Sequence, residues 1–165
     1  EGLSAAKAVA ENKVTASLEN VVEANTLLSG LGFEGGGLAV AHGIAGSYTS
    51  VPVVHDNYLH GEMVAMGTLT QLVMESKEEA RRVAHFFADV GLPIHLGQLS
   101  LSTDDKEALN TVAEATMDFP FIGNMPLALT PESILDFIIE AHELGLEIAQ
   151  SRGDSAYRKL HCVDS

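Results

Sequence analysis

The sequence is poor in cysteine, in positive charge and in long apolar runs. A single cysteine, Cys162, excludes an internal disulfide framework and a cysteine-rich zinc ribbon, and it favours a reducing, cytoplasmic setting. Nine Lys and Arg residues stand against 23 Asp and Glu residues, which gives a formal net charge of −14. Nucleic acids and anionic membrane surfaces need clustered cations, and a bilayer span needs ~20 apolar residues. We therefore expect neither nucleic acid nor membrane as a partner.

The common signatures of nucleophilic and phosphate chemistry are also missing. There is no Gly-x-Ser-x-Gly sequence, and Cys162 has no evident base beside it, so a hydrolase has no support. The run Gly35–Gly37 could cradle a phosphate at the start of a helix, but no strand precedes it, as a dinucleotide fingerprint requires. Close helix packing beside His42 is the favoured interpretation of these glycines.

The sequence that is present predicts helices throughout. Its 165 residues are 46% hydrophobic, which suits one globular domain with a real core. Apolar residues recur at helical spacing, and no segment alternates as a half-buried strand does. The expected helices cover about residues 5–29, 38–45, 59–75, 77–90, 103–117 and 131–150. Gly30 and Gly32 are expected to end the first of them, and residues 46–58 to be the least helical connection.

The predicted fold class is therefore all-α, a bundle of about six helices. Residues 1–150 would form the helical domain, and residues 151–165 a polar C-terminal tail. The chain starts at Glu1 in a stretch that already has a helical pattern, so we expect it to be a piece of something longer.

Two of the seven histidines have neighbours that suit a metal site. His42 and His60 are 18 residues apart, each at the end of an expected helix among small residues. Zinc binds neutral imidazole, and catalytic zinc sites use three protein ligands with one open position. The spacing matches no one-helix motif such as His-Glu-x-x-His, so spacing alone favours two core histidines. Glu62 lies two residues after His60, so it could hydrogen-bond to the residues that hold the metal without binding the metal itself.

The remaining histidines are weaker candidates. His55 lies five residues before His60, which is the wrong step for one helical face, so a surface loop is favoured. His85, His95 and His142 lie in or beside helices without a partner that the sequence identifies. His161 falls in the expected tail.

Longer motifs resemble a known family more specifically than this spacing does. The sequence EANTLLSGLGFEGGGLAVAH, which ends at His42, closely resembles the glycerol dehydrogenases of the iron-containing (group III) alcohol dehydrogenase family. Three further segments share the resemblance: residues 60–72 (HGEMVAMGTLTQL), 90–93 (VGLP) and 124–126 (NMP). The resemblance extends from about Leu3 to Gln150.

The resemblance implies a two-domain enzyme of which this chain is the C-terminal helical domain, similar to that of dehydroquinate synthase. It implies zinc held by one Asp and two His, with the histidines matching His42 and His60 and the Asp lying upstream of Glu1. His42 would also be catalytic and contact the substrate. NAD would be bound mainly by an N-terminal α/β domain, and glycerol would be oxidised to dihydroxyacetone by metal-assisted hydride transfer.

Some features depart from the family pattern or leave alternatives open. Residues 45–47 (AGS) stand where a second histidine and Asn-Gly are common, and the gap between the ligands is about one residue longer than expected. A related Fe²⁺ enzyme for another small alcohol is one alternative, and a non-catalytic helical oligomerisation domain is another. The resemblance also implies a homo-oligomer, often an octamer, and an isolated domain without turnover.

Overall fold

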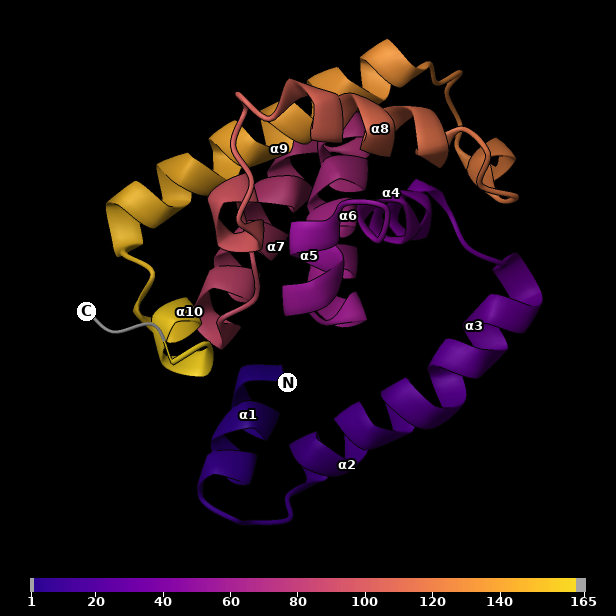
Figure 1. The fold of residues 1–165 in the computed structure, drawn as a ribbon. Coiled ribbons are helices and arrows are strands. Elements are labelled where there is room, and N and C mark those ends of the chain that lie inside the picture. Colours follow the sequence, from indigo (N-terminus) through magenta and orange to yellow (C-terminus); the bar gives the residue numbers. More distant parts are fainter. Residues whose placement is uncertain (1, 163–165) are drawn as a thin grey trace. The chain divides into compact units, whose positions relative to one another are not determined.

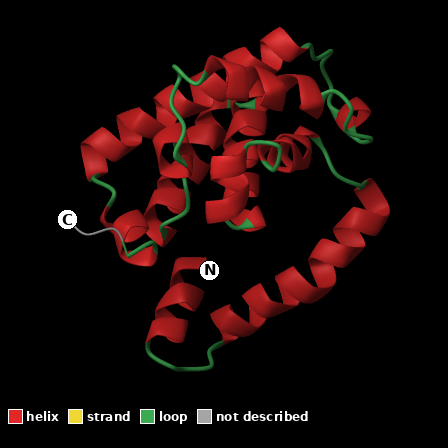
Figure 2. Ribbon diagram, in the orientation of Figure 1, coloured by secondary structure: helices red, strands yellow, loops and turns green. Residues whose placement is uncertain are grey.

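The computed structural model describes residues 2–162, and every regular element in that range is a helix (Figure 2). The predicted all-α class is thus confirmed. Contacts divide the chain into two compact units, residues 1–38 and 39–165. Among residues 2–162, no helix is both long and apolar enough to cross a bilayer.

The first unit is a helical hairpin. Its elements are α1 (Gly2–Ala10), α2 (Ala16–Glu23), the π-helical turn η1 (Ala24–Leu28) and α3 (Ser29–Gly36). Thr15 caps α2, because its hydroxyl accepts the N–H of Leu18. The expected stop at Gly30 and Gly32 is wrong, since both lie inside α3. The helix ends at Gly37, whose φ of 71° is a conformation that glycine adopts freely.

The second unit is a bundle that contains the larger core (Figure 1). Its helices are α4 (Val40–Tyr48), α5 (Pro52–Asn57), α6 (His60–Glu75), α7 (Lys77–Val90), α8 (Lys106–Thr116), α9 (Pro131–Arg152) and α10 (Ser155–Leu160), with short 3-10 turns η2 (Leu96–Leu99) and η3 (Ile122–Asn124). Helix α6 packs against α4, α7 and α9, and α8 covers α4 and α9. Met66, Leu69 and Ile138 are fully buried in this core.

The boundaries of these helices follow local signals in the sequence. Ser76 caps α7, and Gly91 ends it with a left-handed φ of 84°. Thr130 caps α9, which starts at Pro131. The stretch expected to be least helical contains α5, with Pro52 at its first position. The expected tail contains the end of α9 and then α10, while residues 163–165 lie outside the described residues.

Candidate metal centre

His42 lies in the first turn of α4, and helix α6 holds that turn in place at two points. The amide oxygen of Gln71 accepts the N–H of Ala41 at 3.1 Å. The carbonyl oxygen of Ala41 lies so close to Gly67 that a Cβ at position 67 would be 2.1 Å away. The residue directly before His42 is therefore fixed through both of its backbone polar groups. The close helix packing expected of Gly35–Gly37 is wrong for Gly35 and Gly36, where a Cβ would meet no atom within 4 Å. The glycine that packs closely beside His42 is Gly67.

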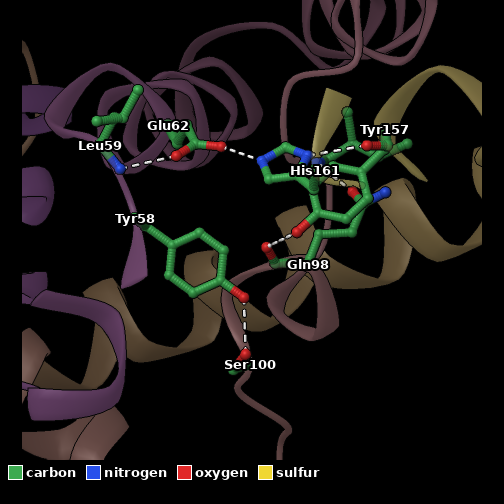
Figure 3. A network of polar contacts seen from close by, with 8 residues as sticks. Tyr58, Leu59, Glu62, Gln98, Ser100, Tyr157 and His161 are labelled. Carbon is green, nitrogen blue, oxygen red and sulfur yellow. Dashed lines mark hydrogen bonds and ion pairs between the residues drawn. The ribbon is translucent and has the colours of Figure 1, made fainter. Parts of the chain in front are cut away.

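His60 is the first residue of α6, and its turn is closed by a carboxylate. The N-cap residue, Leu59, has no side-chain acceptor for the free N–H groups of the helix start. Glu62 supplies the reverse half of a capping box, since its Oε2 accepts the Leu59 N–H at 2.7 Å (Figure 3). Glu62 is only 7% exposed. The sequence places Glu62 near His60, and the structure shows that it stabilises the turn that carries this histidine.

The two histidines predicted as ligands lie side by side. The centres of the His42 and His60 rings are 5.9 Å apart, and the ring planes meet at 49°. Two imidazoles on one tetrahedral zinc ion have ring centres roughly 5–5.5 Å apart, so a small adjustment would seat one ion. Burial lowers the pKa of His42, and the neighbouring His60 lowers it further, which favours the neutral form that binds metals. The spacing of the two rings is therefore close to the spacing that a shared zinc ion requires.

A complete set of three ligands does not occur within residues 2–162. No group of three or more His, Cys, Asp or Glu side chains in this range is placed to hold a metal ion. The other histidines are engaged elsewhere. His55 is exposed and contacts its neighbour Asp56, and His85 contacts Arg152.

A second histidine pair was not foreseen from the sequence. His95 and His142 have ring centres 6.1 Å apart in an edge-on arrangement. His142 Nδ1 accepts the N–H of Leu96 at 3.1 Å, whereas the buried Nδ1 of His95 has no hydrogen-bond partner among the described residues. Beside them, a Cβ on Gly145 would lie 1.6 Å from the carbonyl oxygen of Ile94. This pair joins the segment after α7 to the middle of α9.

The second pair should make stability depend on pH. Burial, reinforced by His142 and opposed by Asp154, lowers the pKa of His95 from 6.5 to about 4. As pH falls below 6.5 the unfolded chain takes up this proton while the folded chain does not, so stability falls and levels off near pH 4. We expect a loss of about 2 kcal/mol, allowing for solvent screening of a half-buried ring.

Chemical denaturation at pH 7, 6, 5 and 4 would measure this contribution, with His95→Asn as the comparison. The variant should lose less stability than the wild type across this window, because it has no ring to protonate. If the free energy of unfolding falls equally with pH in the wild type and in His95→Asn, the pH dependence does not come from His95.

The fold and the site together define a helical domain in which two histidines from different helices lie side by side. The chain is 44% identical over 153 residues to the glycerol dehydrogenase of Escherichia coli O6:H1, which covers 91% of this chain and 41% of that protein. It is 41% identical over 150 residues to the glycolaldehyde reductase of Halobacterium salinarum. The crystal structure of glycerol dehydrogenase from Schizosaccharomyces pombe matches 92% of this chain and 40% of that one, with a TM-score of 0.83 and 40% identity.

The chain is thus a homologue of the glycerol dehydrogenases, as its motifs predict. It spans about two-fifths of the length of the curated relatives that it matches. A search against protein-family models found no match. The fold agrees with the expected C-terminal helical domain of this family.

Proposed function

We propose that this chain is the metal-binding domain of an NAD-dependent dehydrogenase that oxidises glycerol or a similar small polyol. One observation carries the proposal, namely that His42 and His60 come from two different helices yet have ring centres only 5.9 Å apart. In this proposal they are two of three protein ligands of Zn²⁺, and an aspartate outside the chain is the third. A homo-oligomer in the cytoplasm belongs to the same proposal.

The residues of the chain have separate tasks in this mechanism. Zinc, when bound, supplies a Lewis acid that polarises an alcohol oxygen. His42 and His60 hold it through neutral ring nitrogens, and His42, which is half-buried, also contacts the substrate. Gly67 and Gln71 hold the backbone before His42 in position. NAD, which accepts the hydride, would be bound mainly by a domain outside this chain.

Two other functions remain in competition with this one. The relative named glycolaldehyde reductase favours a related enzyme with a different small alcohol or aldehyde, for which Fe²⁺ would serve as the metal. A non-catalytic helical oligomerisation domain would need neither histidine. The two enzymes differ in metal content and substrate preference, whereas the non-catalytic domain differs in its tolerance of histidine replacement.

A chimera tests the proposal directly. The N-terminal part of the E. coli relative, joined to this chain, should oxidise glycerol with NAD, and the 165 residues alone should not. His42→Ala and His60→Ala should each lower kcat/KM about a thousandfold, because a metal Lewis acid contributes several kcal/mol and each 1.4 kcal/mol is a factor of ten. His55→Ala is the matched control, because the His55 side chain is exposed and bonds to Asp56 beside it in the sequence.

The result would go against the proposal in either of two cases. Turnover and metal content that survive both histidine replacements would favour the non-catalytic domain. Robust glycerol oxidation by the isolated 165 residues would contradict the division of the active site between two domains.

A further inference from the structure

Helix α10 is fixed to the rest of its unit at several points. The carbonyl oxygen of Ala156 approaches Gly91, where a Cβ would lie 2.8 Å from it, so only glycine fits at this helix end. The hydroxyl of Tyr157 donates to the carbonyl oxygen of Gln98 at 2.6 Å (Figure 3). These contacts attach α10 to the end of α7 and to η2, and they bring the residue after the helix, His161, to α6.

His161 contacts the carboxylate that closes the first turn of α6. Its ring stacks on Tyr157, with ring centres 4.0 Å apart and planes at 23°. Its Nε2 bonds to Oε1 of Glu62, and its Nδ1 bonds to the carbonyl oxygen of Tyr157 (Figure 3). The side chains of His161 and Glu62 are 19% and 10% exposed. A largely buried ionisable pair thus connects the first turn of α6, which carries His60, to the residue after α10.

Each polar atom of this pair has a defined hydrogen-bond partner. A carbonyl oxygen only accepts, so Nδ1 of His161 donates to Tyr157. The other oxygen of Glu62 accepts the N–H of Leu59. Oε1 of Glu62 bonds to Nε2 of His161. Both carboxylate oxygens therefore have a fixed partner, one at the helix start and one on His161.

We infer that His161 is a positioning residue for His60. It fixes the Glu62 carboxylate, which in turn holds Leu59 and hence the orientation of the first turn of α6. Removal of His161 would leave a nearly buried carboxylate without its partner, and such a group turns toward water and gives up its other contacts. The inference rests on the proposed function in one respect, namely that His60 binds the metal.

Zinc affinity of the 165-residue chain tests the inference. The Cε1–Hε1 NMR signals of His42 and His60 would be followed as Zn²⁺ is added. We expect His161→Ala to weaken zinc binding about 10-fold. This is the lower end of the effect seen when residues that hold metal ligands in position are changed. In the metal-free protein, nuclear Overhauser contacts between the two rings should weaken in the same variant.

Three further variants separate positioning from general stability. Tyr157→Phe removes the bond to Gln98 but keeps the ring under His161, so it should lower the melting temperature and leave zinc affinity within about twofold. Glu62→Gln keeps every bond, because its amide oxygen accepts from Leu59 and its amide nitrogen donates to a neutral His161. It should bind zinc much better than Glu62→Ala, which should resemble His161→Ala.

If His161→Ala keeps the wild-type zinc affinity and the wild-type contacts between the His42 and His60 rings, the inference is overturned, while the proposed function stands. An equal loss of affinity in Tyr157→Phe would also overturn it, because the effect would then follow stability. If zinc leaves the His42 and His60 signals of the wild type unchanged, the proposed function fails, and this inference fails with it.

Discussion

Replacing Gly67 with Ala should lower the free energy of unfolding by about 3 kcal/mol. The new Cβ would lie 2.1 Å from the carbonyl oxygen of Ala41, a backbone atom that cannot turn aside. Helices α4 and α6 would have to move apart beside Ala41, the residue before His42. Typical domains are stable by only 5–15 kcal/mol, so this is a large share of the total.

Gly61→Ala is the matched control for this prediction. It lies in the same helix, and a Cβ there would meet no atom within 4 Å. Because alanine favours helix over glycine, this variant should be as stable as the wild type or more stable, by up to about 1 kcal/mol. Urea denaturation compares the three proteins. Equal stability of Gly67→Ala and the wild type would show that α4 and α6 do not pack as closely as described.

Replacing His42 or His60 with Ala should abolish specific zinc binding by the chain. Catalytic zinc sites normally have three protein ligands, so the pair alone binds weakly and the loss of either ring leaves no chelate. Calorimetric titration with Zn²⁺ would measure the loss, with His55→Ala and His85→Ala as controls that keep the wild-type affinity. Retention of zinc affinity in both His42→Ala and His60→Ala would place the ion elsewhere.

The sequence predicts those parts of the fold that depend on local signals. The longer helices of the second unit follow from helical periodicity and from caps such as Ser76, Thr130 and Gly91. Gly30 and Gly32 were misleading, because glycine is only modestly unfavourable inside a helix and α3 continues through them to Gly37. Pro52 suggested a loop but occupies the first position of α5, where proline is favourable.

The sequence predicts less of the surroundings of the site, because they depend on contacts between distant residues. The motifs point to His42 and His60, and the structure brings their rings together. The pairing of Glu62 with His161 joins residues 99 positions apart. The pairing of His95 with His142 joins a residue just before η2 to one in α9, and no sequence motif links the two. Gly67 looks like any helix glycine in the sequence, and only the position of Ala41 explains it.

Residue-resolved zinc titration of the 165-residue chain tests the central claim most directly. If His42 and His60 form the metal-binding pair, their ring signals shift together as Zn²⁺ is added, while those of His95 and His142 stay unchanged. Ring signals of His42 and His60 that do not move, or zinc that shifts the His95 and His142 signals instead, would contradict the account.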